Sequence, residues 1–172
     1  MPTLTARVRR FNLADLRQRG VGVGSLFETI KQYFERDGYE FRQLPNHEAL
    51  EMGVAGDNGS YRLVCVVDPG RTIVRFLTFV EGKAPEARRR DVMEYLTRAN
   101  YGLLLGNFEL DLSDGEVRFK CAIDVEGGEI THTQYQNLLY VAVSMVDRYF
   151  PGLQRVVQGS ADPAAAIAEV EQ

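Results

Sequence analysis

The sequence predicts an α+β domain with one antiparallel sheet of about five strands and helices packed on it, in the order α-βββ-α-ββ-α. Two observations support this prediction. Tight-turn signals join short runs rich in β-branched and aromatic residues, and strands joined by tight turns pair antiparallel. Amphipathic stretches with helical spacing stand before, between and after the two groups of strands.

A first helix is predicted over Ser25 to Asp37, because Ser25 and Glu28 have the spacing of a capping box and Gly38 follows as a stop. Its apolar residues fall on one face, as docking on a sheet requires. They are Leu26, Phe27, Ile30, Tyr33 and Phe34. Upstream, Asn12 to Arg19 could form a short helix.

The first group of strands is a meander. Asn58-Gly59 lies between two apolar runs and predicts a hairpin, and Asp68-Pro69-Gly70-Arg71 fits a type II turn before a strand over Thr72 to Val80. The opposite residues expected in the hairpin are Val54 and Leu63, Met52 and Cys65, and Leu50 and Val67.

Both faces of this meander are apolar. One face carries Leu63, Cys65, Val67, Val74 and Phe76, and the other carries Val64, Val66, Ile73, Leu77 and Phe79. A sheet that is apolar on both sides needs a cover on each. We expect the first and third helices on one face, and the second helix, a second copy of the chain or an extended ligand peptide on the other. The second set is our hypothesis for a homodimer or partner-binding surface.

A second helix is predicted from Pro85 to about Asn100. Its expected buried stripe is Val92, Met93, Leu96 and Ala99. Arg88-Arg89-Arg90 fits the solvated side of this helix better than a contact with an acidic partner or a nucleic-acid phosphate.

The second group of strands is a hairpin around Asp114-Gly115. In the register that this turn predicts, every apolar residue meets an apolar one and every acid meets a base. The pairs are Leu112 with Val117, Asp111 with Arg118, Leu110 with Phe119, Glu109 with Lys120 and Phe108 with Cys121. The apolar members, with Ile123 and Val125, are expected to face inward.

A third helix, capped by Thr131 or Thr133, is predicted to end at Pro151-Gly152. Its apolar positions are Tyr135, Leu138, Leu139, Ala142, Val143, Val146, Tyr149 and Phe150. Asp162-Pro163 then caps a short helix from Ala164 to about Glu171, whose apolar stripe is too thin to stand alone.

Composition divides the chain into a basic arm with a Gly-rich linker over residues 1–24, one α+β domain over 25–158 and a short C-terminal helix within 159–172. The net charge is −4. The first 20 residues hold five arginines against one aspartate, so they carry +4 and the remainder carries −8. This acidic balance argues against a general nucleic-acid binder.

Cys65 and Cys121 occupy inward strand positions and lack the close spacing of a redox or zinc motif, so we expect reduced core residues. No apolar run approaches the ~20 residues that span a bilayer, and no apolar stretch of a signal peptide follows the N-terminal charges. These features predict a soluble cytoplasmic protein without a membrane partner.

The sequence contains no recognisable catalytic, cofactor or metal site. His47 lies in a polar loop and His132 at a helix start, and neither has a second histidine or a cysteine nearby. Asp111 to Gly115 resembles a calcium loop, but the glycine comes one place early and the bidentate acid is missing. Gly22 to Ser25 could bind a phosphate, but without a Gly-Lys-Ser/Thr ending it fits a flexible linker better.

Three segments carry a family resemblance: Tyr95-Leu96-Thr97-Arg98-Ala99-Asn100-Tyr101-Gly102, Phe108-Glu109-Leu110-Asp111 through Asp114-Gly115, and Asp147-Arg148-Tyr149-Phe150-Pro151. They are similar to bacterial YbjN-domain proteins, described as sensory transduction regulators. The resemblance spans roughly Ser25 to Val157, and the basic arm departs from it. It implies the fold of type III secretion chaperones, which are cytoplasmic, often dimeric, non-enzymatic holders of extended partner segments.

The leading hypothesis is therefore a non-enzymatic binding module, chaperone-like or regulatory, that holds a partner protein segment or acts through dimerisation. The alternative is a small-molecule or nucleotide sensor with its ligand near Gly22 to Ser25 or between helix and sheet, which a deep pocket with convergent polar groups would favour. An enzyme ranks third, because no nucleophile–base pair or metal cluster stands out.

Overall fold

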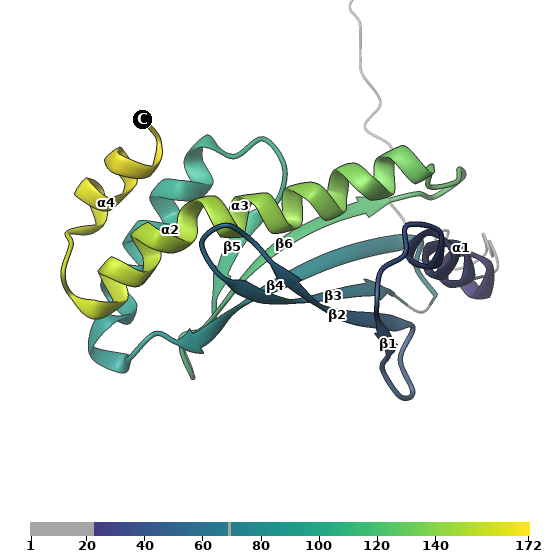
Figure 1. Ribbon diagram of the computed structural model, residues 1–172, viewed down its shortest axis with the longest axis horizontal. Helices are drawn as coiled ribbons and strands as arrows, with labels where there is room; N and C mark the ends of the chain where they lie inside the picture. Colours follow the sequence, from purple (N-terminus) through teal and green to yellow (C-terminus); the bar gives the residue numbers. More distant parts are fainter. Residues whose placement is uncertain (1–22, 69) are drawn as a thin grey trace, which may run out of the picture.

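The computed structural model describes residues 23–68 and 70–172, which form a six-stranded antiparallel sheet and four α-helices (Figure 1). The strands lie in the order β1-β2-β3-β4-β6-β5. They are β1 Arg42–Gln43, β2 Ala49–Ala55, β3 Ser60–Val67, β4 Ile73–Lys83, β5 Asn107–Leu110 and β6 Glu116–Asp124. The helices are α1 Val23–Arg36, α2 Arg89–Gly102, α3 His132–Gln158 and α4 Pro163–Val170, with a 3₁₀ turn η2 Glu86–Arg88 before α2.

The predicted fold class is confirmed, including the pairing of β4 with β6 that joins the two groups of strands into one sheet. The predicted number of strands is one short. The missed strand, β1, contains two exposed residues, so it offers no alternation of apolar and polar residues from which a strand could be predicted.

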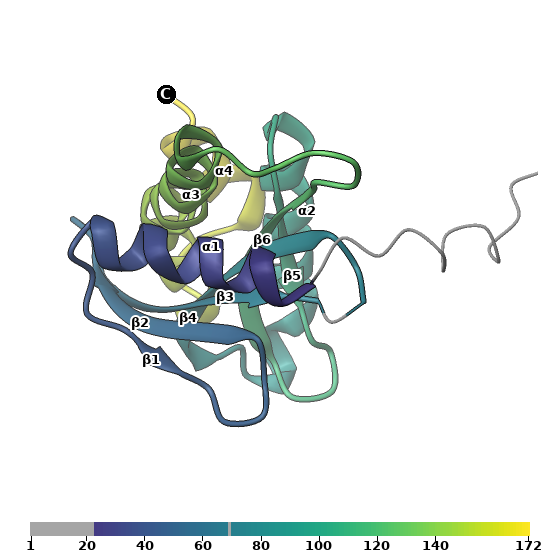
Figure 2. The same ribbon diagram turned by 90° about the vertical axis from the view of Figure 1, so that its right-hand side faces the viewer.

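The helices pack on one side of the sheet (Figures 1 and 2). The main core joins residues of α1, α2, α3 and α4 to the sheet face that carries Leu63, Cys65, Val67, Val74 and Phe76. The predicted stripe of α1 is confirmed, with Ile30 and Phe34 fully buried. The option that α2 covers the opposite face is wrong, because α2 packs against β5 and α3 and buries its apolar residues in this same core.

Both predicted hairpin registers are wrong by two residues. The last pair of the first hairpin is Ala55 with Ser60, because its loop has four residues rather than two, so Leu50 lies opposite Cys65. In the second hairpin the last pair is Leu110 with Val117. Since side chains alternate with period two, this shift leaves the faces of the paired residues unchanged.

Two residues expected in the core are exposed. Leu112 falls in the longer turn of the second hairpin and is exposed instead of facing inward. On α2, Met93 is exposed, and Tyr95 is fully buried in the stripe that Met93 was expected to share. The capping prediction for Ser25 is also wrong, because α1 starts two residues earlier and Ser25 lies inside its first turn.

The predicted end of α3 at Pro151 is wrong, since the helix continues to Gln158. Pro151 has no N–H to donate to the carbonyl of Asp147, but the Nδ2 of Asn58 donates to that carbonyl at 3.0 Å. The side chain of Asn58, which is distant in sequence, thus supplies the hydrogen bond to the carbonyl of Asp147 that Pro151 cannot make. Of the two candidate caps, Thr131 is the one used, in a capping box with Gln134.

The predicted cap of α4 is confirmed: the Asp162 carboxylate accepts hydrogen bonds from the backbone N–H groups of Ala164 and Ala165 at 3.0 and 3.2 Å. α4 packs on α2 and α3. Over the described residues, every helix is too short or too polar to cross a membrane.

Candidate functional site

The side of the sheet away from the helices, hereafter the open face, holds all five residues of the predicted binding surface. The strand register aligns Val64 with Leu77, Val66 with Arg75 and Arg62 with Phe79. Ile73 lies on the same face of β4, opposite Asp124 of β6. Among the described residues, the small apolar cluster on this face draws no member from a helix.

The centre of the open face is a second, smaller core. Ala49, Val64 and Leu77 are buried, the last two with only 5% and 7% of their surface exposed. Leu44, Val66 and Phe79 pack against them and stay partly exposed. The chain alone therefore covers Val64 and Leu77, so the side chains of the predicted set that a partner could reach are Val66, Phe79 and Ile73.

Two charged groups flank this apolar centre. On the β1 side, Glu51 is shared by Arg42 and Arg62, at 2.7 and 3.6 Å. On the β5 side, Glu109 is shared by Arg118 at 2.7 Å and by Lys120. Within each group one acid faces two bases, which leaves one positive charge per group, and Glu40, Glu81 and Glu116 also line the groove beside Phe79.

Glu109 is surrounded by groups that favour its carboxylate form. Burial alone would raise its pKa, but the hydrogen bonds and charges of Lys120 and Arg118 lower the pKa below its ordinary value. The surplus positive charge of this group therefore persists at neutral pH. It stands out on residues 23–172, whose formal charge is −8.

Phe79 lies between the two charged groups. The guanidinium carbon of Arg62 sits 3.8 Å from the centre of the Phe79 ring, and that of Arg118 sits 6.0 Å away. Cation–π attraction holds Arg62 over the ring, so a cation and an aromatic ring are presented together. Nearby, Arg75 is paired with Asp68 at 2.6 Å.

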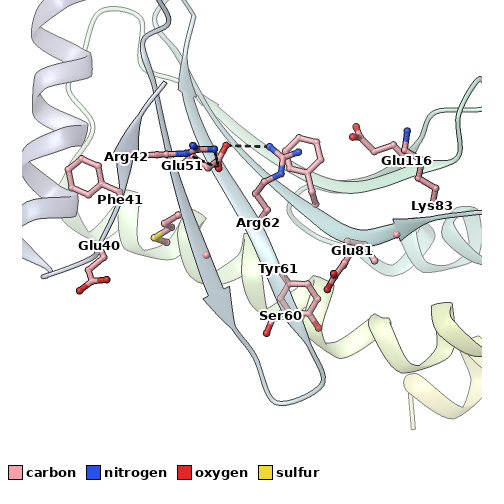
Figure 3. A pocket seen from close by; sticks show the side chains of 15 residues that line it. Glu40, Phe41, Arg42, Glu51, Ser60, Tyr61, Arg62, Glu81, Lys83 and Glu116 are labelled. Carbon is pink, nitrogen blue, oxygen red and sulfur yellow. Dashed lines mark hydrogen bonds and ion pairs between the residues drawn. The ribbon is translucent and has the colours of Figure 1, made fainter. Parts of the chain in front are cut away.

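A groove of about 680 Å³ runs beside Phe79 between β1–β2 and the end of β4. Figure 3 shows the ion pairs of Arg42, Glu51 and Arg62 on one side, and Lys83 and Glu116 on the other. β1 pairs with only two residues of β2, Leu50 and Glu51. The outer edge of β2 beyond Glu51 therefore lies open along the groove, among the residues that the structure describes.

The prediction from sequence placed Glu109 beside Lys120, and this ion pair is present, but it left the flanking charges out of the binding surface. It selected the apolar residues of β3 and β4 and left out Arg62, Arg118 and Glu51. The available signal was alternation, since Arg62 occupies the same face of β3 as Val64 and Val66. Long charged side chains can cover apolar neighbours with their aliphatic stems. On the open face, Arg62 does so by lying over the ring of Phe79.

The two histidines have structural surroundings. His132 Nε2 lies 2.8 Å from Asp37 Oδ1 and links the start of α3 to the end of α1, whereas His47 is exposed in a turn. Within residues 23–68 and 70–172, no group of three or more histidine, cysteine or acidic side chains is placed to hold a metal ion. The possible phosphate site at Gly22 to Ser25 falls at the limit of the described residues, and the basic arm lies outside them.

The segments that carried the family resemblance have clear roles in the fold. The hydroxyl of Tyr95 donates to the carbonyl of Tyr149 at 2.7 Å and ties α2 to α3. The amide of Asn100 accepts from the N–H of Phe108 at 2.7 Å and donates to its carbonyl at 3.1 Å. Asn100 thereby closes part of the outer edge of β5.

Asp147 fastens the β2–β3 turn to α3. Its carboxylate accepts hydrogen bonds from the backbone N–H groups of Asp57 and Asn58 at 3.1 and 2.9 Å, and from the hydroxyl of Tyr61 at 2.8 Å. We call this arrangement the Asp147 clasp. These contacts explain the third segment of the resemblance as a structural motif.

Comparison with solved structures supports the same fold. The chain resembles the crystal structure of YbjN from E. coli, titled "a putative transcription regulator", with a TM-score of 0.55 and 14% identity over 70% of this chain and 85% of that one. It also resembles ExsC in the structure of the ExsC–ExsE complex, with a TM-score of 0.51 and 13% identity over 74% and 92% of the two chains. No curated protein matches the sequence significantly.

The fold is thus of the type III secretion chaperone-like class. The model of the YbjN family, described as "Putative bacterial sensory transduction regulator", matches residues 27–155, which is 129 of the 172 residues. That range includes the whole sheet, α1 from Phe27, α2 and most of α3. The chain belongs to the YbjN family.

Proposed function

We propose that this chain is a non-enzymatic module that binds an extended, acidic segment of a partner protein on its open face. The observation that carries the proposal is the partly exposed set Val66, Ile73 and Phe79 on the open face, over which no described helix lies. A sheet face that keeps apolar side chains accessible outside the main core is a common interaction site.

The chemistry of the partner follows from the two charged groups. Apolar side chains of the segment would cover Val66 and Phe79, and its carboxylates would neutralise the surplus charge beside Arg62 and Arg118. Charge complementarity of this kind steers association and selects partners more than it adds affinity. The chain's own first 20 residues carry +4 and are therefore a poor occupant of this face.

The comparisons support a role in protein binding. ExsC, which shares the fold, was solved in complex with ExsE, and the YbjN family is described as regulatory. We further propose that the protein acts in the cytoplasm, where a regulator would meet such a partner.

Affinity capture from the native host, followed by titration of the recovered protein, tests the proposal. We expect Phe79→Asp and Arg62→Glu to weaken binding at least tenfold while circular dichroism stays unchanged. Tyr140→Asp changes an exposed residue of α3 and serves as the matched control, with binding retained. Binding that is unaffected by the two open-face substitutions, or that strengthens with salt, would refute the proposal.

A further inference from the structure

The turn between β2 and β3 contains the only Asn-Gly pair of the sequence, Asn58-Gly59. In such a pair the backbone nitrogen that follows the asparagine can attack the side-chain amide, because glycine has no side chain to shield that nitrogen. The two reacting groups belong to neighbouring residues, so they meet without a binding step. Whether the reaction proceeds in a folded chain depends on how the structure holds these two groups.

The contacts of α3 account for both residues of this pair. The β2–β3 turn lies against α3 (Figure 1), where the Nδ2 of Asn58 donates to the carbonyl of Asp147 at 3.0 Å. This is the carbonyl that Pro151 leaves without an N–H. A Cβ at position 59 would lie 2.8 Å from the ring of Phe150, so the next residue has to be small. Packing against α3 therefore selects two residues that form a reactive pair.

The attacking group of this pair is free in the folded chain. The backbone N–H of Gly59 has no hydrogen-bond acceptor among the described residues, whereas the carbonyl of Gly59 accepts the N–H of Gly56 at 2.8 Å and closes the turn. The side chain of Asn58 is exposed, so water reaches it. The nitrogen that attacks and the water that completes the reaction are thus both available.

The Asp147 clasp holds the other reacting group, the side-chain amide of Asn58. Its Nδ2 donates to the carbonyl of Asp147 at 3.0 Å and to Oδ2 of the same residue at 3.3 Å. The backbone N–H of Asn58 donates to Oδ1 at 2.9 Å. The attack makes the amide carbon tetrahedral and requires Nδ2 to depart, so both hydrogen bonds of Nδ2 must break. The closed clasp therefore opposes the reaction.

We propose that Asn58 is a site of spontaneous amide loss and that the Asp147 clasp sets its rate. After hydroxide removes its proton, the Gly59 nitrogen forms a bond to the side-chain amide carbon of Asn58, and Nδ2 takes up a proton and leaves as ammonia. Water then opens the resulting five-membered ring at either of its carbonyl carbons. The products are aspartate and isoaspartate. One water is consumed and one ammonia is released, without oxidation or reduction.

The aspartate product cannot remake the clasp. A carboxylate oxygen would replace the donor Nδ2, and an ionised carboxylate only accepts hydrogen bonds. The carbonyl and the carboxylate of Asp147 would both lose the donor that now lies 3.0 and 3.3 Å away. Two carboxylates would also lie side by side, which is unfavourable while both are charged. Amide loss is therefore a one-way release of the β2–β3 turn from α3.

The released turn borders the groove of the open face, because Ser60 and Tyr61 at the start of β3 line that groove. The modification would thus loosen the end of the sheet next to the proposed binding surface. It is measured on the chain alone, without a partner, so its outcome is independent of the proposed function.

Mass spectrometry of the full chain and of its peptides, during incubation at mildly alkaline pH, follows the reaction at each asparagine. We expect Asp147→Ala to lose the amide of Asn58 at least tenfold faster than the wild type, because its clasp is open. Asn58→Gln should keep its amide, since its longer side chain would have to form a larger ring. Asn46 is exposed but precedes a histidine, so it should stay intact in the same samples.

Asn100→Ala separates the effect of the clasp from a general loss of stability. Asn100 bonds to the backbone of Phe108 in β5 and not to the turn. At a temperature where circular dichroism shows every variant folded, Asn100→Ala should therefore lose the Asn58 amide at the wild-type rate. A wild-type chain that reacts as fast when folded as in urea, an Asp147→Ala variant no faster than the wild type, or equal acceleration by Asn100→Ala would overturn the inference.

Asn58→Asp reproduces the aspartate product genetically. At neutral pH it should unfold at a lower urea concentration than Asn58→Ala, because both variants lose the donor but only aspartate adds a charge beside Asp147. Repulsion between like charges is lost when a carboxyl takes up a proton, so the difference between the two variants should vanish in acid. Equal urea midpoints of the two variants at neutral pH would show that the product leaves the turn in place, against the inference.

Discussion

Replacing Asp147 with alanine tests the Asp147 clasp. The carboxylate accepts four hydrogen bonds from three residues of the β2–β3 hairpin, namely Asp57, Asn58 and Tyr61. A hydrogen bond to a charged group contributes about 1.5–3 kcal/mol, but water can replace the donors at the exposed turn. Only the partly buried hydroxyl of Tyr61 would lose its partner without replacement, so we expect Asp147→Ala to cost about 2–3 kcal/mol in total.

Urea unfolding followed by circular dichroism measures this free energy. At pH 7 the variant should unfold at a clearly lower urea concentration, and its melting temperature should fall by roughly 5–10 °C, at about 2–4 °C per kcal/mol for a chain of this size. Glu94→Ala is the matched control, since it removes an acid whose ion pair with Arg98 is exposed. An exposed pair of this kind contributes about 0.3–0.5 kcal/mol.

The pH dependence provides a separate test. Burial alone would raise the pKa of Asp147, but the hydrogen bonds from Asn58, Tyr61 and Asp57 lower it below the ordinary value. A carboxyl with a lowered pKa in the folded state stabilises the protein fully above its unfolded pKa of about 3.9, and this stabilisation is lost as the pH falls through the folded pKa. The difference between wild type and Asp147→Ala should therefore shrink as the pH drops below about 4. A loss under 0.5 kcal/mol at pH 7, or a difference that grows in acid, would refute the reasoning.

Three further predictions concern buried contacts. Gly152→Ala should destabilise the protein by more than about 2 kcal/mol, because the added methyl would lie 2.4 Å from the hydroxyl oxygen of Tyr95, and Tyr95→Phe should relieve part of that loss in a double-mutant cycle of urea midpoints. Asn100→Ala should cost about 1–3 kcal/mol and increase aggregation measured by light scattering, since it leaves the N–H of Phe108 without its partner on the edge of the sheet; unchanged stability would contradict this. Burial raises the pKa of Cys121 to about 12, so a thiol reagent at pH 8 should label it only after denaturation, and rapid labelling of the native protein would count against the buried position.

Much of the fold follows from local signals in the sequence. The buried apolar stripe of α1 and the N-cap of α4 depend on residues that lie within one or two helical turns of each other. The structure confirms both predictions. The faces of the strands were also predicted correctly, because alternation survives a shift of two residues. Local patterns therefore determine which residues face the core.

The errors arise where distant residues decide the outcome. Pro151 was expected to end α3, but Asn58, far away in sequence, supplies the missing donor to the Asp147 carbonyl. The four-residue loop of the first hairpin was not evident either. Its glycines leave room for α3, since a Cβ at Gly56 would lie 2.1 Å from the Asp147 carboxylate, and one at Gly59 would lie 2.8 Å from the ring of Phe150.

The candidate site was predicted only in part. The sequence identified which strand residues would share a face, but not that α2 would leave that face uncovered, because helix placement depends on packing across the whole chain. Met93 illustrates the same limit. Its spacing suited a buried stripe, yet Tyr95 is buried there and Met93 is exposed.

The pairing of β4 with β6 has a consequence for how the chain reaches its native state. Every other neighbouring pair of strands is adjacent along the chain, whereas the pair Lys83 with Glu116 closes a segment of 32 residues, 84–115. Compared with the four-residue loop of the first hairpin, closing that segment costs roughly 2 kcal/mol more in chain entropy. The β1–β4 meander and the β5–β6 hairpin can therefore form early and independently. The pairing of β4 with β6 then sets the barrier to folding. Substitutions along the β4–β6 seam should slow folding, whereas those in the outer hairpins should mainly speed unfolding.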